Sequence, residues 1–451
     1  MDEVRTLKVY LVRDNHPEWV GTLERKANQK FVFTYREGVS LDNYVSLTMP
    51  VRRESYVNAH LHPAFQMNVP EGRLRDLLRQ RFGKLMNIDD MGLLAIVGKY
   101  TLGRLRFTVE SEDLQAVPSV PAIAKDTLDD HEGARTLFAD LMDRYAATSG
   151  VSGVQDKVLA PIFEVVNAEC VERVSLHTRD AILKTEDSQD LPCLAINEFY
   201  CLRAAEKSGL PVATATLSAN RRILIVDRFD LDHQKSPRGF EDFCALTNTP
   251  AESKYALSLE KTIKIVRHFI APAHRNAAME DLFGALVLNN LIRNGDAHLK
   301  NFAVIYDRYD NARLAPLFDL VTTTVYDDLR HDIPALSVGG RKAWMTSKDL
   351  IGAAIQIFGL TQGRAKDIIE RTVSGVEQAA IEVAGEVESN SRFSEIGLRM
   401  LHAWNEGVKS LVSKKPGERA GVVTGIDRLM DLQHLPEDQR SAASVPAAPR
   451  P

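Results

Sequence analysis

The polar segment NGDAHLKN lies at residues 294–301 of this 451-residue sequence. An apolar segment at residues 277–292 precedes it, and the run FAVIY at residues 302–306 follows it. The first segment is apolar nearly all round, as expected for a helix buried inside a lobe, and the second has the composition of a strand. The polar stretch therefore interrupts a buried helix just before a strand begins.

Two residues of this stretch have a spacing that suggests chemistry. Asn301 follows Asp296 by five positions, which is the interval between the catalytic Asp and the metal-binding Asn of a protein-kinase loop. In that loop the Asp accepts the proton of the substrate hydroxyl and the Asn is a ligand of Mg²⁺. Asp319, 18 positions further on in the run LFDL, fits a second Mg²⁺ ligand. The alternative is a polar turn whose Asp and Asn only cap a helix or a hairpin.

A lysine upstream fits the same chemistry. Lys184 ends an apolar strand at residues 181–184, and Glu198 lies on the helix predicted over residues 194–208. A strand lysine held by a helix carboxylate meets the ATP phosphates in kinases. A lysine at a strand end is commonplace, but its order before Asp296 and Asp319 favours the functional interpretation.

Two further segments complete the pattern. Residues 149–157 contain two glycines before a strand, without the spacing of a Walker A loop, and their backbone N–H groups could approach phosphate oxygens. Asp227, Phe229 and Asp230 follow a strand at 223–226, where a kinase has the hinge that holds adenine and ribose. Flexible or solvated turns are the alternatives in both places. His298 is expected to be a structural hydrogen-bonding residue.

The chain as a whole is predicted to have an α+β, bilobal fold. Short β-branched and aromatic runs dominate the first third, and helical patterns dominate after residue 256. We predict a small N-terminal subdomain at 1–115, a β-rich lobe at 116–250, a helical lobe at 251–413 and a weakly ordered tail at 414–451.

Composition limits the remaining function classes. The net charge of −5 gives no whole-chain sign of nucleic-acid binding. The four cysteines lack metal-ligand spacing, so buried free thiols are expected. No stretch has the roughly 18 apolar residues that a membrane span needs, and a cytoplasmic location is expected.

Taken together, these segments resemble the HipA family of toxin–antitoxin kinases. The resemblance is strong over residues 149–338 and looser over residues 1–115. Asp156 departs from the family pattern, where Glu or Pro is expected. The matching segments are SGVQDK (152–157), Lys184, NEFY (197–200), VDRFD (226–230), EDFC (241–244), NGDAHLKNF (294–302) and LAPLFDL (314–320).

The resemblance implies a two-lobed kinase fold and an ATP- and Mg²⁺-dependent Ser/Thr protein kinase. Asp296 would be the catalytic base, and Asn301 and Asp319 would bind Mg²⁺. In the family a serine of the glycine-containing loop is autophosphorylated, which silences the kinase; Ser152 matches best, with Ser149 as the second possibility. The residues expected at the nucleotide are Ser152, Gly153, Val154, Lys184, Asp227, Phe229, Asp230, His298 and Asn301.

The resemblance also implies partners. Family members phosphorylate aminoacyl-tRNA synthetases, typically the glutamyl enzyme, which causes growth arrest and persistence. A small helix-turn-helix antitoxin that binds operator DNA is the expected partner, and no membrane partner is expected. Two alternatives remain open: a nucleotide-binding corepressor that acts by assembly with the antitoxin, and a kinase for a small molecule or lipid.

Overall fold

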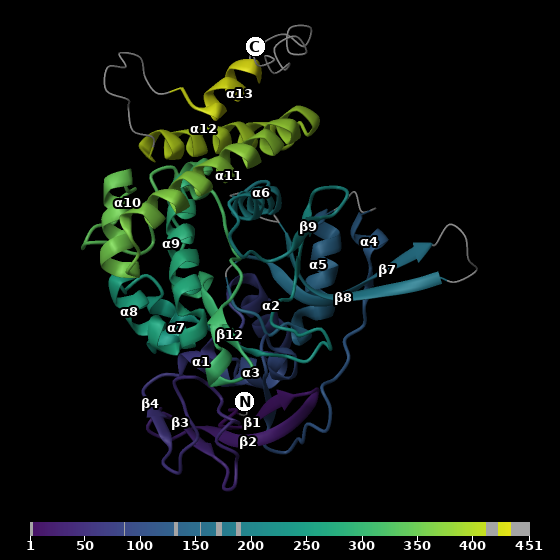
Figure 1. Cartoon of the computed structure of the whole chain (residues 1–451). Coiled ribbons are helices and arrows are strands. Elements are labelled where there is room, and N and C mark those ends of the chain that lie inside the picture. Colours follow the sequence, from purple (N-terminus) through teal and green to yellow (C-terminus); the bar gives the residue numbers. More distant parts are fainter. Residues whose placement is uncertain are drawn as a thin grey trace. The chain divides into compact units, whose positions relative to one another are not determined.

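The computed structural model describes residues 3–84, 86–129, 134–153, 155–167, 174–185, 191–411 and 423–433 (Figure 1). The chain divides into two compact units. The first comprises Met1–Ala195, Ala213–Ala278 and His298–Phe318, and the second comprises Ile196–Val212, Met279–Ala297 and Asp319–Pro451. Strands occur with helices in the first unit, whereas the second is built from helices and loops, so the predicted α+β class is confirmed.

Three sheets occur among the described residues of the first unit. One is antiparallel, with the strand order β4-β3-β2-β1-β5. Its strands are β1 Thr6–Arg13, β2 His16–Arg25, β3 Phe31–Tyr35, β4 Tyr56–Asn58 and β5 Leu105–Val109. Another has the order β6-β7-β8-β10-β9, with a parallel β6–β7 pair. Its strands are β6 Ile123–Ala124, β7 Lys157–Asn167, β8 Val174–Thr185, β9 Ala215–Leu217 and β10 Ile223–Asp227.

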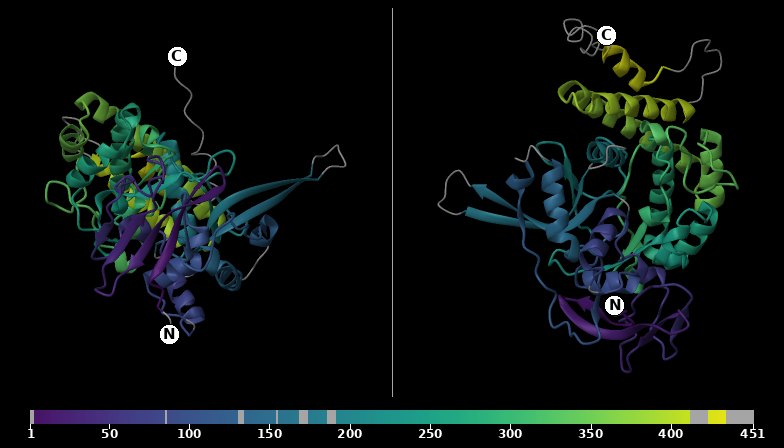
Figure 2. Two further views of the ribbon diagram at one scale, coloured as in Figure 1. Left: turned by 90° about the horizontal axis from the view of Figure 1, so that it is seen from below. Right: turned by 180° about the vertical axis from the view of Figure 1, so that it is seen from behind.

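The third sheet carries the strand that follows the NGDAHLKN stretch. It consists of β11 Gly239–Asp242, β12 Ala303–Tyr306 and β13 Arg313–Leu314. Figures 1 and 2 show β7 and β8 projecting as a two-stranded ribbon beyond the other strands of their sheet. The helices of this unit are α1 Pro63–Gln66, α2 Gly72–Phe82, α3 Asp90–Val97, α4 Lys125–Asp129, α5 Ala134–Tyr145, α7 Phe243–Thr247 and α8 Leu259–Phe269.

One hydrophobic core joins the first two sheets. It runs from Leu7 and Phe33 in the N-terminal sheet through Leu141 on α5 to Val158 and Ile225 in the second sheet. The predicted boundary at 115/116 therefore does not separate two cores. The boundary at 250/251 also differs from the compact units, because α8 and the β12–β13 hairpin belong to the first unit.

Helices make up the second unit. α6 Leu194–Lys207 and α9 Arg275–Leu291 enter it from the first, and α10 Ser347–Ala353, α11 Gln362–Ser389, α12 Ser394–Leu411 and α13 Gly425–Gln433 follow. α13 packs against α11 and α12, as Figure 2 shows. The expected weakly ordered tail is therefore wrong for residues 425–433, where Ile426 is buried and Asp427 accepts hydrogen bonds from Asn405 and Lys409.

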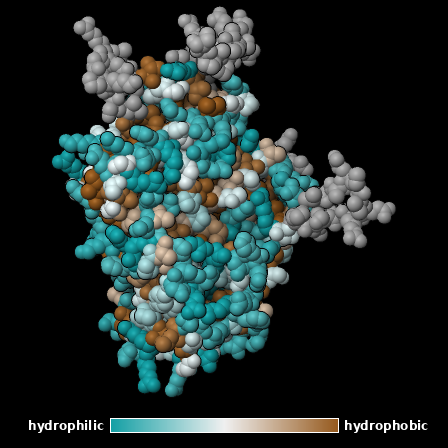
Figure 3. Space-filling view, in the orientation of Figure 1, coloured by the Kyte–Doolittle hydropathy of each residue, from teal (hydrophilic) through white to brown (hydrophobic). Residues whose placement is uncertain are grey.

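The cysteines, the length of the apolar helices and the surface are the remaining features of the fold. Cys193, Cys201 and Cys244 are buried free thiols, as expected, and Cys170 lies outside the described residues. No helix in the described ranges is long and apolar enough to cross a membrane. On the face drawn in Figure 3, hydrophobic residues form small separate patches among hydrophilic ones.

Candidate functional site

The segment that leads to Asp296 is held by a network within the second unit. Arg293, just after α9, has a left-handed backbone (φ +55°) that turns the chain out of the helix. The Asn294 amide donates to Oδ1 of Asn289 (2.8 Å), and its own Oδ1 accepts the backbone N–H of Asp296 (3.1 Å). An Asn side chain that accepts an N–H two residues on closes a local turn. The turn therefore fixes the backbone at Asp296.

Gly295 is required by close packing in the same turn. Its N–H donates to Oγ1 of Thr323 (2.9 Å), and a Cβ at this position would lie 2.1 Å from Oδ2 of Asp332. Asn294 and Gly295 are buried, whereas the Asp296 side chain is exposed. The loop thus presents one carboxylate on a rigid support.

The second half of the loop, residues 298–301, belongs to the first unit. His298 is buried, its ring packs edge-on against Tyr255 (centroids 5.1 Å apart), and Leu299 donates to the carbonyl of Lys254. The expected role of His298 as a structural hydrogen-bonding residue stays a prediction. The Asn301 side chain is 8% exposed and follows in a short 3₁₀ turn.

A buried ion pair that the sequence did not indicate holds this half of the loop. Lys300 pairs with Glu71, which precedes α2, and their side chains are 7% and 21% exposed. Asp242 caps α7 through Ala245 N–H (2.8 Å). Burial raises the pKa of Asp242 to about 6, although the charge of Lys300 opposes this shift. The N-terminal part of the chain therefore contacts the loop through a charged residue next to Asn301.

Two lysines lie side by side on neighbouring strands of the second sheet. Lys184 on β8 pairs in register with Lys157 on β7, and they are 3% and 5% exposed. Paired residues of antiparallel strands project from the same face, and like charges at such positions repel. Two buried ammonium groups on one face are therefore suited to an anion. Sequence reasoning missed Lys157 as a site residue, although it ends the loop motif.

The glycine-containing loop lies beside Lys157. Gly153 has φ +116°, and a Cβ there would lie 2.6 Å from Nζ of Lys157, so the ammonium group rests against the glycine. Ser149 is fully buried; its Oγ donates to the carbonyl of Tyr145 (2.7 Å) and accepts Leu159 N–H (2.9 Å). Ser152 is half-buried, and Val154 lies outside the described residues.

Asp156, which departs from the family pattern, anchors the end of this loop. Its carboxylate pairs with Arg73 on α2 (2.9 Å), and its carbonyl accepts the N–H of Thr185 (3.2 Å). The loop is thereby tied to the strand end that carries Lys184.

The hinge segment after β10 has a different role for each residue. Asp227 accepts a hydrogen bond from Nη1 of Arg179 (3.0 Å), and burial raises its pKa above the ordinary value. Phe229 packs against Phe240 and Phe318, with ring centroids 6.0 and 5.6 Å apart. These contacts fix an aromatic side chain beside the third sheet.

Asp230 is already bound within the protein. Nε and Nη2 of Arg228 donate to its two oxygens (3.0 and 2.6 Å), and Gly103 N–H donates to Oδ2 (2.7 Å). Although burial opposes the shift, Arg228 holds the pKa of Asp230 below its ordinary value. The expected ribose contact would require this ion pair to open, because Asp230 is only 3% exposed.

Asp319 occupies a strained position in the second unit. Its φ of +53° places a non-glycine residue in the left-handed region. Three residues later, Thr322 exchanges two hydrogen bonds with the Asn197 amide (2.9 and 3.0 Å) and accepts Trp404 Nε1–H at Oγ1 (2.8 Å). These contacts hold the segment after Asp319 to α6, next to Glu198.

The expected site residues are divided between the two units. Lys184, Asp227, Phe229, Asp230, His298 and Asn301 lie in the first, and Asp296, Asp319 and Glu198 lie in the second. The pairing of Lys184 with Glu198 stays a prediction.

Asn301 carries an amide oxygen and Asp319 a carboxylate oxygen, and their assignment as Mg²⁺ ligands stays a prediction. These are the ligand types that Mg²⁺ prefers, and water and nucleotide phosphates commonly complete its coordination. Within the described ranges, no group of three or more His, Cys, Asp or Glu side chains could hold a metal ion.

Comparison with known proteins gives similarities over most of the chain. Residues 149–380 match the family model of the HipA-like C-terminal domain, and residues 9–108 match that of the HipA N-terminal domain. The chain is 28% identical over 374 residues to a Sinorhizobium fredii protein named "Putative kinase Y4mE", covering 79% of this chain and 86% of that protein. A Haemophilus influenzae protein with a similar name is 26% identical over 156 residues, or 31% of this chain and 45% of that protein.

A solved structure resembles the fold over nearly its whole length. It is the Shewanella oneidensis HipA in a complex of HipA, HipB and operator DNA. The TM-score is 0.64 at 19% identity, and the match covers 89% of this chain and 97% of that one. This similarity confirms the predicted HipA-type fold.

Proposed function

The chain belongs to the HipA family, and on this basis we propose that it is an ATP- and Mg²⁺-dependent Ser/Thr protein kinase toxin. The observation that supports the proposal most is the construction of the loop around Asp296. A buried network fixes Asn294 and Gly295, and the following carboxylate is exposed. Such a preorganised, accessible carboxylate suits a catalytic base.

In the proposed reaction, Asp296 orients a serine or threonine hydroxyl and accepts its proton. Phosphoryl transfer depends mainly on positioning and on charge neutralisation at the phosphate oxygens. Lys184 and Lys157 would supply positive charge to these oxygens, and the backbone around Gly153 would lie against them. Asn301 and Asp319 would hold Mg²⁺, which neutralises phosphate charge when it is bound.

The nucleotide base would lie at the hinge. Phe229 would pack against adenine, and backbone groups of residues 227–229 would bind its edge. We expect Asp230 to act mainly by holding Arg228, because its carboxylate is buried in that ion pair. Asp227 is the more accessible carboxylate for a ribose hydroxyl, since its side chain is 34% exposed.

We propose that Ser152 is the autophosphorylation site. Ser149 is fully buried, and its hydroxyl is used both as donor and as acceptor within the protein. Ser152 is half-buried in the glycine-containing loop. A phosphate on Ser152 adds a charge of about −2 beside Lys157, which would compete with the nucleotide phosphates for this ammonium group.

The proposed substrate is an aminoacyl-tRNA synthetase, the glutamyl enzyme first, and the proposed partner is a helix-turn-helix antitoxin. The solved Shewanella HipA that shares this fold is in a complex with HipB and operator DNA, which supports the antitoxin and the DNA as partners. Phosphorylation of the synthetase would stop charging of its tRNA and arrest growth.

The test is incubation of the full chain with γ-³²P-ATP, Mg²⁺ and purified glutamyl-tRNA synthetase. Label on the chain and on the synthetase is expected. Label only in an added lipid fraction would favour the lipid-kinase alternative. A chain that binds ATP without transferring label to any acceptor would contradict the proposal and favour the corepressor alternative, which a gel shift with antitoxin and operator DNA would then examine.

A further inference from the structure

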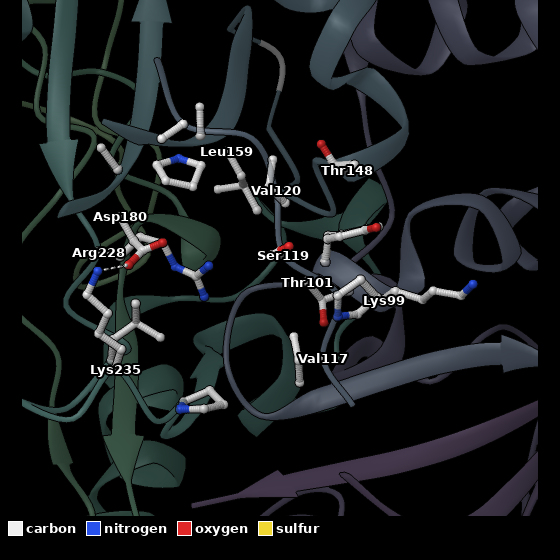
Figure 4. Close-up of a pocket in the computed structure, with 18 of the residues that line it drawn as sticks. Lys99, Thr101, Val117, Ser119, Val120, Thr148, Leu159, Asp180, Arg228 and Lys235 are labelled. Carbon is white, nitrogen blue, oxygen red and sulfur yellow. Dashed lines mark ion pairs between the residues drawn. The ribbon is translucent and has the colours of Figure 1, made fainter. Parts of the chain in front are cut away.

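A cavity of about 350 Å³ lies within the first unit, and its lining includes Arg228 of the hinge segment. Its walls come from the segment 99–101, the start of β5, the segment 117–122, strands β7 and β8, and the segment 228–237. Figure 4 shows Asp180, Arg228 and Lys235 on one side, and Lys99, Thr101 and Thr148 on the other. This volume is within the usual range for small-molecule sites.

Two guanidinium groups line the cavity with unused donors. Arg106 is 4% exposed, all three of its hydrogen bonds leave from Nη1, and its Nε has no partner among the described residues. Arg228 uses Nε and Nη2 for Asp230, and within the described chain its Nη1 makes no hydrogen bond. Arg106 is the buried one of the two, and an unused donor on a buried arginine is costly unless a ligand satisfies it.

The charge around the cavity is positive. Lys99, Arg106, Arg228 and Lys235 line it, whereas Asp180 is the one lining carboxylate in the described residues. Asp180 contacts Lys235 at 3.4 Å, and Lys99 pairs with Glu112 outside the lining. Burial, and then the neighbouring Arg228, lower the pKa of Arg106 to about 9. The carboxylate of Asp230, which binds Arg228, opposes this shift, and an anion in the cavity would add a second negative charge beside Arg106.

The rest of the lining is apolar. Val120, Leu159 and Pro161 are among its members, with hydroxyl groups of Thr101 and Thr148 beside them. A ligand that fits this wall has an uncharged, weakly polar body as well as an anionic end. Arginine forks match phosphate oxygens by paired hydrogen bonds, which favours phosphate as the anionic group.

The cavity is not the proposed nucleotide site. Its lining contains neither Lys184 nor Phe229, the residues expected at the ATP phosphates and at adenine. Lys184 is four residues along β8 from Asp180, about 13 Å at the strand rise of about 3.3 Å per residue. A ligand in the cavity would therefore bind away from Lys184.

We propose that this cavity binds a small phosphate-bearing metabolite, with Arg106 and Arg228 on its phosphate and Lys235 at the rim. The site uses none of the side chains assigned to phosphoryl transfer, and it shares Arg228 with the hinge segment whose backbone is proposed to bind adenine. Because Nε and Nη2 of Arg228 bind Asp230, the phosphate would bind the remaining Nη1 of this hinge residue.

The test is equilibrium dialysis of the full chain with ³²P-labelled inorganic pyrophosphate, in the presence of saturating adenylyl imidodiphosphate and Mg²⁺. One equivalent of pyrophosphate is expected to remain bound when the nucleotide site is filled. Lys235→Gln should weaken binding about fivefold, because it removes one rim charge and leaves the fold intact. Ser119→Trp, at an exposed lining position, should block entry without removing charge.

Lys26→Gln is the matched control, since Lys26 and Lys235 have similar exposure (48% and 53%) and each pairs with one carboxylate. This control should leave pyrophosphate binding unchanged. The proposal is overturned if the wild-type chain binds no pyrophosphate, if the nucleotide analogue displaces it, or if Ser119→Trp and Lys235→Gln both bind it like the control.

Discussion

Lys157 and Lys184 occupy directly paired positions on β7 and β8, and both are buried. Two ammonium groups on one face of a sheet gain from a polyanion between them. Lys157→Met is expected to raise the Kd of an ATP analogue at least about tenfold, the loss of one hydrogen bond to a charged group. Isothermal titration calorimetry checks this, with Lys26→Met as control; an unchanged Kd would show that Lys157 does not contact the phosphates.

The ion pair between Lys300 and Glu71 should stabilise the fold. Glu71→Gln leaves the buried ammonium group of Lys300 without its ion-pair partner, so the free energy of unfolding is expected to fall by about 2–4 kcal/mol. Urea denaturation measures it. Adding Lys300→Met should recover part of the loss, because the unpaired charge is removed. If the loss of stability in the double variant equals the sum of the losses in the two single variants, the two residues do not interact.

Ser149 and Ser152 should respond oppositely to removal of their hydroxyls. Ser149→Ala loses two buried hydrogen bonds and is expected to lower the free energy of unfolding by about 1–3 kcal/mol while autophosphorylation persists. Ser152→Ala should leave stability unchanged and abolish the label on the loop. Peptide mapping after incubation with γ-³²P-ATP distinguishes them, and label on Ser149 would reverse the assignment.

Replacement of Asp319 by glycine should change stability and function in opposite directions. A glycine avoids the left-handed strain at φ +53°, so Asp319→Gly is expected to raise the free energy of unfolding by about 1 kcal/mol. The same change should abolish Mg²⁺-dependent ATP binding, because the carboxylate is lost. A less stable Asp319→Gly variant would contradict the backbone strain, and a variant that retains Mg²⁺-dependent ATP binding would contradict the Mg²⁺ role of Asp319.

His62 should make stability depend on pH. Burial lowers its pKa to about 4, and its Nδ1 accepts Ala64 N–H at the start of α1. In the unfolded chain the pKa of His62 is near 6.5, so between pH 6.5 and 4 the unfolded chain binds more protons than the folded chain. The free energy of unfolding therefore decreases by up to about 3 kcal/mol as the pH is lowered through this range. His62→Asn keeps the capping acceptor and should flatten this slope in denaturation curves; an identical slope would refute the assignment.

The sequence predicted the elements around the loop because their signals are local. The apolar run ending at residue 292 became α9, and the runs around Lys184 and Ile225 became β8 and β10. The pairing of Lys300 with Glu71 joins residues 229 positions apart, and the register of Lys157 with Lys184 depends on strand pairing. The core shared across residue 115 likewise depends on packing, so local patterns could not reveal it.

Asp296 is proposed to be the catalytic base. Asp296→Asn keeps the shape of an exposed side chain, and Asp310→Asn is the matched control on an exposed turn after β12. Transfer of ³²P from γ-³²P-ATP is the measurement. We expect Asp296→Asn to fold and bind ATP but to transfer no label above background, whereas Asp310→Asn should match the wild type. Transfer at the wild-type rate by a folded Asp296→Asn variant would contradict this assignment.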